Sequence, residues 1–190
     1  GSRLPEALGN ARRLLECLAL WQPNQPATAL LASGSTPTAQ AWQDLLAQAG
    51  FTPVAQTAEV AATGATASWR LGRLTVLLGQ HSFTRWAGWA ELGLATAGTA
   101  TEQLVGLGVP ALSLPGPGPQ FKAGFARRQS RLLGGAVQPC SSPQQLVDRL
   151  RQLLADPSER ARLAAIGRRR MGPSGGSAQL AALVEQRLLG

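Results

Sequence analysis

The sequence predicts an α/β fold in which a Rossmann-like parallel sheet carries helices on both faces. Short apolar runs alternate along the chain with stretches whose leucines recur at helical spacing. Glycine or proline separates most of these runs, as at the connections between strands and helices. The apolar runs are continuous, which is typical of parallel strands that are buried on both faces.

A chain of 190 residues is long enough for one domain with a hydrophobic core, and we expect residues 1–190 to form a single domain. No apolar run approaches the ~20 residues that span a bilayer, and no stretch has the pattern of a signal peptide. Cys17 and Cys140 lie far apart without the spacing of a metal site. We therefore expect two buried free thiols in a cytoplasmic protein, with no metal and no cofactor.

Basic residues outnumber acidic ones by 18 to 10, which gives a net charge of +8. Residues 91–190 hold twelve basic and six acidic groups, against six and four in residues 1–90. Such a charge suits nucleic acid, an anionic membrane surface or phosphate groups. We expect no nucleic-acid partner, because aromatic residues are not interleaved with the basic ones and tyrosine is absent.

The first quarter of the chain predicts two helix–strand pairs. An amphipathic helix is expected over Ala7–Trp21 and an apolar strand over Ala27–Ser33. A second helix is expected over Thr38–Ala49, closed by a glycine, and a short strand over Phe51–Gln56. Glu59–Ser68 is rich in Ala, Thr and Gly, so we expect an irregular surface loop there.

A hairpin and a tryptophan-bearing helix follow. Trp69–Leu71 and Leu74–Leu78 flank a glycine turn and predict two antiparallel strands. Phe83–Glu91 predicts a helix in which Trp86 and Trp89, three residues apart, share one buried face.

The stretch from Leu92 to Arg131 predicts strand, glycine turn, helix, strand, proline-glycine loop and helix. Leu94–Ala97 is a short apolar strand that ends at Gly98. Thr99 and Thr101 can cap the start of the next helix, and Glu102 lies in its first turn. The remaining elements are a strand over Ala111–Leu114, a loop over 115–119, a helix opened by Gln120, a turn and short strand over 134–139, and helices over Gln144–Leu154, Glu159–Met171 and Ala178–Leu189.

Two of these turns have the composition of a nucleotide site. Gly98–Glu102 and Gly116–Gln120 follow successive parallel strands, and ligands of such sheets lie beyond the carboxyl ends of the strands. Each turn precedes a helix and offers free backbone N–H groups to an anion. A carboxylate among those donors suits a sugar diol. The pattern therefore predicts a ribose at Glu102 and phosphates at the helix starts.

Three motifs give the chain a resemblance to a known family. They are Gly1-Ser2-Arg3 with Glu6, Gly98-Thr99-Ala100 with Glu102, and Gly118-Pro119-Gln120-Phe121 with Gln129. On these residues the chain resembles the C-terminal half of the GT-B glycosyltransferase fold. It is most similar to the lipid-A-disaccharide synthase-related family, and more distantly to lipid-A-disaccharide synthase and the muramyl-pentapeptide N-acetylglucosaminyl transferase. The resemblance covers nearly the whole chain but about half of a GT-B enzyme.

The resemblance implies a glycosyltransferase that inverts configuration and moves a sugar from a UDP-sugar donor to a lipid or sugar acceptor, without an obligatory metal. In it, Arg3 and the amides near Gly98 face the diphosphate, and Glu102 holds the ribose. Gln120 contacts phosphate or sugar, and Gln129 supports that helix or the sugar. The residues implied in donor binding are Arg3, Gly98, Thr99, Thr101, Glu102, Gly118, Gln120, Phe121 and Gln129.

The catalytic residues are unknown, because the general base of such enzymes comes from an N-terminal acceptor domain that residues 1–190 lack. We therefore expect this fragment to bind its donor and to be inactive alone. Ser2 and His81 are implied at the cleft between the domains, although His81 is equally explained as an ordinary loop residue. Gly1-Ser2 is either the native motif, preceded by a further strand, or the scar of an expression tag.

Two other functions stay open. One is a non-catalytic nucleotide-binding or membrane-associated module of the same fold, and the other is an epimerase acting on UDP-sugars. The run Arg168–Arg170 fits either peripheral contact with anionic lipid at the inner face of a membrane or a solvated helix end with a favourable dipole contact.

Overall fold

The computed structural model describes residues 4–116, 118, 121–173 and 175–189. Its strands form two sheets. One sheet is parallel, in the order β5-β6-β7, and the other is mixed, in the order β1-β4-β3-β2. The strands are β1 Ala27–Ser33, β2 Thr52–Val54, β3 Ala67–Leu71, β4 Leu74–Gln80, β5 Gly93–Ala95, β6 Ala111–Ser113 and β7 Val137–Pro139.

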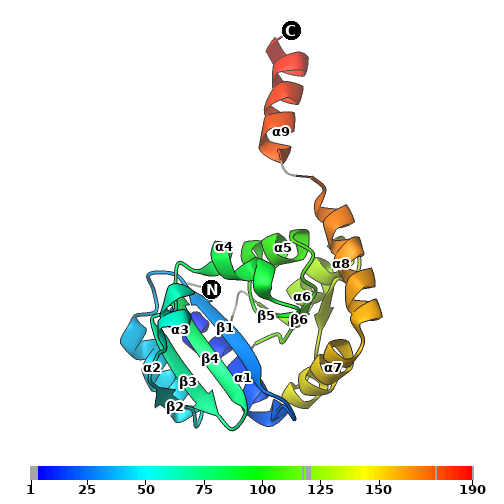
Figure 1. Ribbon diagram of the computed structural model, residues 1–190. Helices are drawn as coiled ribbons and strands as arrows, with labels where there is room; N and C mark the ends of the chain where they lie inside the picture. Colours follow the sequence, from blue (N-terminus) through cyan, green and yellow to red (C-terminus); the bar gives the residue numbers. More distant parts are fainter. Residues whose placement is uncertain (1–3, 117, 119–120, 174, 190) are drawn as a thin grey trace.

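Helices surround both sheets (Figure 1). The α-helices are α1 Glu6–Trp21, α2 Ala39–Gln48, α3 Ala58–Ala62, α4 Phe83–Trp86, α5 Thr99–Gly106, α6 Ala123–Leu132, α7 Pro143–Ala155, α8 Pro157–Met171 and α9 Gly176–Val184. A 3-10 turn over Ala87–Trp89 continues α4, and a π-helical turn over Glu185–Leu189 continues α9.

The parallel sheet is covered on both faces, which confirms the predicted fold class. Leu112 of β6 packs with Cys17 of α1 and Leu146 of α7 on one face. The next residue towards the start of the strand, Ala111, packs with Val105 of α5 on the other face. Successive side chains of a strand point to opposite faces, so one short apolar strand serves two helix layers.

The mixed sheet departs from a wholly parallel arrangement. β1 runs parallel to β4, but β3 pairs antiparallel with β4, and β2 antiparallel with β3. The predicted hairpin is confirmed, with Gly72 at φ +57° in its turn. A two-residue connection forces the antiparallel direction, since a parallel pair needs a crossover of a dozen residues or more.

Helix α1 joins the two halves of the molecule. Its Leu15 is buried with Val76 and Trp42 beneath the mixed sheet, while its Cys17 is buried beneath the parallel sheet. The other face of the mixed sheet packs Leu77 against Trp86 of α4. One amphipathic helix therefore contacts both cores.

Two local predictions are wrong. The expected loop over Glu59–Ser68 contains α3 and the start of β3, because the Thr57 hydroxyl accepts the Val60 N–H at 3.3 Å and so caps a helical turn. Trp86 and Trp89 do not share a buried face, since they are 2% and 56% exposed. The change from α-helix to 3-10 turn after Trp86 rotates Trp89 outward.

The last helix stands apart from the body. Figure 1 shows α9 projecting beyond α8, and its Leu180 and Leu183 are 62% and 46% exposed. Across the described ranges, no helix combines the length and the apolar character needed to cross a membrane.

Candidate functional site at the carboxyl edge of the parallel sheet

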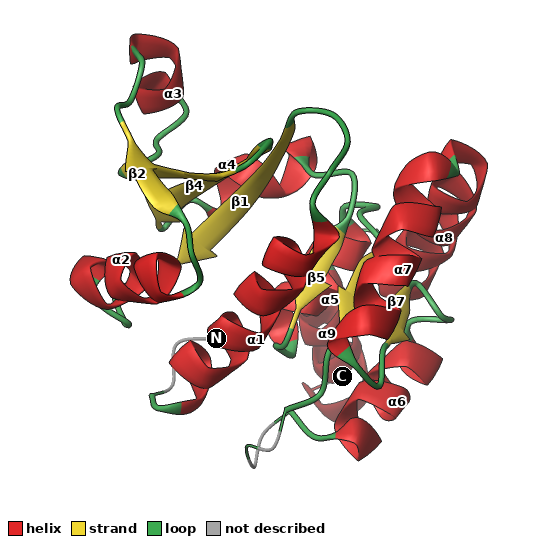
Figure 2. Cartoon of the chain, turned by 90° about the horizontal axis from the view of Figure 1, so that it is seen from below, coloured by secondary structure: helices red, strands yellow, loops and turns green. Residues whose placement is uncertain are grey.

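The two predicted ligand turns lie at one edge of the molecule. β5 and β6 are parallel and in register from Gly93↔Ala111 to Ala95↔Ser113, so both strands end at the same edge. The first strand leads through Gly98 into α5, and the second leads through the Pro-Gly loop and Phe121 into α6 (Figure 2). This is the edge at which ligands of parallel sheets bind.

Helix α5 starts with unoccupied amides. Gly98 is its N-cap residue, and its carbonyl accepts the N–H groups of Thr101 at 3.0 Å and Glu102 at 3.1 Å. In the part of the chain that the structure describes, the N–H groups of Thr99 and Ala100 have no acceptor. These are the donors that a helix start offers to an anion.

The expected threonine caps are absent at this helix start. No side chain caps α5, and the Thr101 hydroxyl instead donates to the Ala97 carbonyl at 2.7 Å. Thr101 is 2% exposed, so its hydroxyl is used within the turn. The prediction that Thr99 or Thr101 caps the helix is wrong, and the consequence is a helix start whose first amides stay available.

Gln129 of α6 supports the same turn from below. Its side-chain nitrogen donates to the carbonyls of Ala97 and Gly98, both at 3.2 Å. The residue is 2% exposed, and its Oε1 is buried without a partner among the described residues. The Gln129 side-chain amide thereby connects the turn at Gly98 to α6, the helix that follows the second predicted turn.

Glu102 carries the free carboxylate of the site. It lies half-buried in the first turn of α5, and within the described ranges its side chain has no hydrogen bond or ion pair. A half-buried acceptor beside unoccupied N–H donors suits a ligand that has both an anionic and a hydroxyl group.

Phe121 contributes its backbone to the second turn. Its ring is 3% exposed and lies 5.5 Å, centroid to centroid, from that of Phe125. Its N–H donates to Glu6 Oε1 at 3.2 Å. A Cβ on Gly118 would lie 2.5 Å from the same Glu6 oxygen, so a side chain there would displace the Glu6 carboxylate. Glu6 at the start of α1 therefore anchors the Pro-Gly loop.

Arg13 also holds this loop and Asn10 lies against it, and neither residue was predicted from the sequence. A Cβ on Gly116 would lie 2.6 Å from Asn10 Oδ1 and 3.3 Å from Arg13 Nη1. The Arg13 guanidinium donates to the Leu114 carbonyl at 3.5 Å and to that of Pro115. The spacing of residues 6, 10 and 13 on one helix face was the signal that could have found them.

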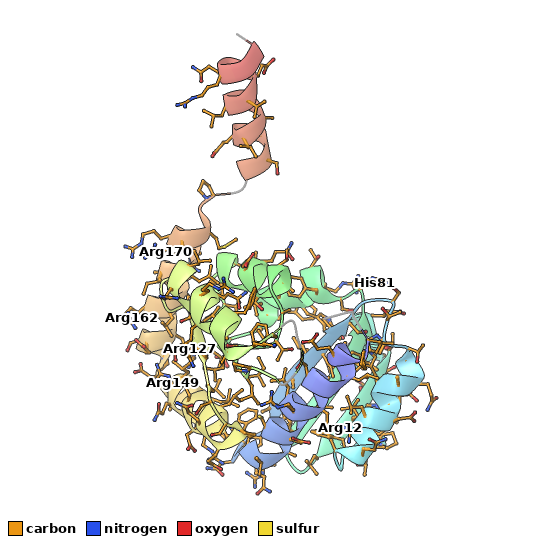
Figure 3. The ribbon with its side chains drawn as sticks, turned by 180° about the vertical axis from the view of Figure 1, so that it is seen from behind. Arg12, His81, Arg127, Arg149, Arg162 and Arg170 are labelled. Atoms are coloured by element: carbon orange, nitrogen blue, oxygen red, sulfur yellow. The ribbon has the colours of Figure 1, made fainter. Side chains whose placement is uncertain are left out.

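His81 is not brought to these turns. It follows β4 with φ +55°, is exposed, and donates its N–H to the Ser33 carbonyl at 2.7 Å. Figure 3 shows it on the opposite side of the molecule from Arg127 and Arg149. Left-handed backbone at a histidine is uncommon but tolerated in a tight turn. The predicted site residues Ser2, Arg3 and Gln120 lie outside the described residues.

The basic excess lies on the helices that follow the site. Arg127, Arg149, Arg162 and Arg170 run along one side of the molecule, from α6 to α8 (Figure 3). Glu159 neutralises part of this surface, since Arg149 and Arg162 pair with it at 3.3 Å and 2.6 Å. The last turn of α8, Arg168–Arg170, has no ion pair to any described acidic residue.

The two cysteines are structural. Both are free and are buried in one hydrophobic cluster. Burial raises the pKa of the Cys17 thiol to about 11 despite the nearby Arg13, and burial raises that of Cys140 to about 11 as well. Neither is a nucleophile at neutral pH. Among the residues placed by the structure, no group of three or more His, Cys, Asp or Glu side chains could hold a metal ion.

A cavity of about 1440 Å³ lies between β1 and β5 and reaches the candidate site near Ala97 and Thr101. Its walls are mainly apolar. Glu91 and Arg151, its charged lining residues, are paired elsewhere, with Arg160 at 3.2 Å and Asp148 at 3.5 Å. The size of this cavity favours it as a ligand site. The N–H groups without acceptors, however, lie at the start of α5.

Comparison with known proteins adds little. No protein-family model matches the chain, and no curated protein matches it. A solved structure titled "Crystal Structure Analysis of the Glycotransferase of kitacinnamycin" is similar over 86% of this chain and 44% of that one, with 17% identity and a TM-score of 0.46. The chain thus spans less than half of that structure. A likeness at this level assigns no function to this chain.

Proposed function

We propose that this chain is the donor-binding domain of a GT-B glycosyltransferase that uses a UDP-sugar and is related to the lipid-A-disaccharide synthase-related family. The observation that carries the proposal is the start of α5. There, two N–H groups without acceptors adjoin the half-buried, unpaired carboxylate of Glu102 at the carboxyl edge of a parallel sheet.

The diphosphate of the donor would lie against the glycine turn. The amides of Thr99 and Ala100 and the dipole of α5 supply the positive potential, and Gly98 allows close approach because it has no side chain. The Pro-Gly loop, held by Glu6 and Arg13, forms the second wall. Arg3 and Gln120 join the site by the resemblance alone.

The ribose would lie at Glu102. A carboxylate repels a phosphate group placed against it, so a phosphate ligand alone would make no favourable contact with Glu102. A nucleoside diphosphate satisfies both features, because its ribose diol donates to the carboxylate while its phosphates accept from the amides.

Catalysis would require a second domain. In this proposal the general base and the lipid or sugar acceptor come from an N-terminal domain across the cleft, so residues 1–190 alone bind UDP and do not turn it over. The unpaired Arg168–Arg170 and the exposed apolar residues of α9 would face the anionic membrane that carries a lipid acceptor.

The test is a calorimetric titration of the full-length protein with UDP and with ATP. Glu102→Gln should lower UDP affinity about tenfold or more, because a hydrogen bond to a charged group contributes ~1.5–3 kcal/mol. Glu59→Gln is the matched control, since Glu59 also lies in the first turn of a helix, α3, and should leave UDP affinity unchanged.

Two outcomes would contradict the proposal: ATP binding as tightly as UDP, or Glu102→Gln binding UDP like the unaltered protein. UDP binding by a full-length protein that transfers no sugar would instead identify a non-catalytic nucleotide-binding module, and interconversion of the UDP-sugar itself would identify an epimerase.

A further inference from the structure

A serine at the end of β6 is buried beside the candidate site without a partner. Ser113 is fully buried, and its hydroxyl has no hydrogen bond to any described residue. Thr101 of α5 and Gln129 of α6 are also buried, and both hold the glycine turn after β5. Buried polar groups are hydrogen-bonded with few exceptions, so the Ser113 hydroxyl needs an explanation.

The pattern of the core places these three polar side chains in one layer. Helix residues four apart and strand residues two apart share a face. Thr101 lies four residues before, Ser113 two residues after and Gln129 four residues before a member of one apolar cluster, which contains Val105, Ala111 and Leu133. Since α5 and α6 start at the carboxyl edge and β6 ends there, the polar side chains form the next layer of this core towards that edge.

The Gln129 side chain crosses the end of β6. Helix α6 packs against β7, whereas the Gln129 amide nitrogen reaches the carbonyls of Ala97 and Gly98, which follow β5. In the sheet, β6 lies between those two strands. The side chain therefore passes over the carboxyl end of β6, where Ser113 is the last strand residue and points to the same face.

The two atoms without partners in this layer are complementary. The Gln129 nitrogen donates to two carbonyls, which fixes the orientation of the amide and directs its Oε1 elsewhere. This oxygen can only accept a hydrogen bond, and the Ser113 hydroxyl can donate one. Neither atom has a partner among the described residues.

We propose that Ser113 is a positioning residue of the donor site. Its hydroxyl donates to Gln129 Oε1, directly or across one buried water, and so holds the amide with its N–H groups towards Ala97 and Gly98. Ser113 itself touches no donor and acts through Gln129. The inference rests on the proposed donor site at the start of α5.

The geometry of the peptide group carries the effect to the ligand. The Gly98 carbonyl and the Thr99 N–H belong to one planar peptide group and point in opposite directions. The hydrogen bond from Gln129 to that carbonyl therefore aims the Thr99 N–H away from Gln129, towards the proposed position of the diphosphate. Without the Ser113 hydroxyl the Gln129 amide can rotate, and the Thr99 N–H loses this alignment.

The first test is made without any ligand, by NMR of the full-length protein. Ser68→Ala is the matched control for Ser113→Ala, because Ser68 of β3 is also buried with an unpartnered hydroxyl but lies in the other sheet. We expect Ser113→Ala to shift the signals of the Gln129 side-chain amide and the Thr99 backbone amide, and Ser68→Ala to leave both in place. Unchanged signals in Ser113→Ala would overturn the proposal.

The second test is the affinity for UDP, measured by calorimetry. Ser113→Ala should weaken UDP binding by about threefold to tenfold, as expected for the loss of one neutral hydrogen bond. Gln129→Met keeps the length of the side chain but removes the amide. In that background Ser113→Ala should cause no further loss, because the two residues act as one unit. Additive losses from the two substitutions would contradict the proposal, since an independent structural role of Ser113 predicts them.

Failure of the proposed function gives a different result. If the unaltered protein does not bind UDP, there is no donor for Ser113 to position, which overturns the proposal as well. The spectra without UDP distinguish this outcome from the absence of a contact between Ser113 and Gln129. If Ser113→Ala does not fold, Ser113→Cys replaces it, because a thiol fills the same space but is a weak donor. The same signals should then shift, and unchanged signals would again overturn the proposal.

Discussion

β6 and β1 have the same kind of sequence and opposite surroundings. Both are apolar strands of parallel pairs, but all three residues of β6 are buried and none of the seven of β1 is. β6 has a strand on each edge and a helix layer on each face. β1 has a described neighbour on one edge only. The burial of a parallel strand therefore depends on its neighbours in the sheet. An apolar sequence alone does not determine how far the strand is buried.

The same contrast separates the two edges at which ligands could bind. At the end of β5, Gln129 and Thr101 hold the backbone so that two amides stay unoccupied. At the end of β4, the His81 N–H is already used by Ser33. The turn after β5 therefore presents unsatisfied donors, whereas the N–H group of the turn after β4 is already used.

The largest expected effect comes from truncating a leucine in each strand. Leu112→Ala in β6 should lower the free energy of unfolding by about 2–5 kcal/mol, because Leu112 is fully buried. Leu31→Ala in β1 should lower it by only about 1 kcal/mol in the 190-residue chain, since Leu31 is partly in water. Urea unfolding measures both.

Equal effects of the two substitutions on the free energy of unfolding of the 190-residue chain would contradict the contrast between the strands.

A smaller effect is expected from pH, through the core behind the parallel sheet. Burial holds the pKa of both Cys17 and Cys140 at about 11, above the ordinary 9.0. The unfolded chain therefore loses these protons first as the pH rises. The stability that the buried thiols contribute is fully present below pH 9 and is lost as the pH rises to about 11.

The control for this prediction is the double variant Cys17→Ala and Cys140→Ala. We measure the urea concentration at the midpoint of unfolding at pH 8 and at pH 11. The difference between these two midpoints should be smaller for the double variant than for the unaltered protein. A thiol reagent should likewise react with the folded protein only slowly at neutral pH. Rapid modification of both thiols without unfolding would show that this core is open.

Most elements could be predicted from the sequence, because local signals determine them. Ala27–Ser33 was predicted to the residue, and the Gly72 turn gave the hairpin. Helix α3 was missed because its Thr57 cap lies in a stretch too rich in small residues to show a helical period. The face of Trp89 was wrong because a 3-10 turn cannot be told from an α-helix by spacing alone.

The site was less predictable, because its support comes from distant parts of the chain. The turns at Gly98 and Gly118 were expected at one edge, and the parallel register places β5 and β6 so that they are. The contacts of Asn10 and Arg13 with the loop after β6 join residues about a hundred positions apart. No local pattern encodes such a contact, although the helical spacing of residues 6, 10 and 13 marks the face that makes it.

The central claim is that the start of α5, at the carboxyl edge of the parallel sheet, binds a nucleoside diphosphate. The most direct measurement is an NMR titration of the full-length protein with UDP, followed through its backbone amides. We predict the largest shifts at Thr99 and Ala100, with a response at Glu102 and little change at His81. Shifts centred on His81 and the end of β1, with the α5 amides unchanged, would contradict the account.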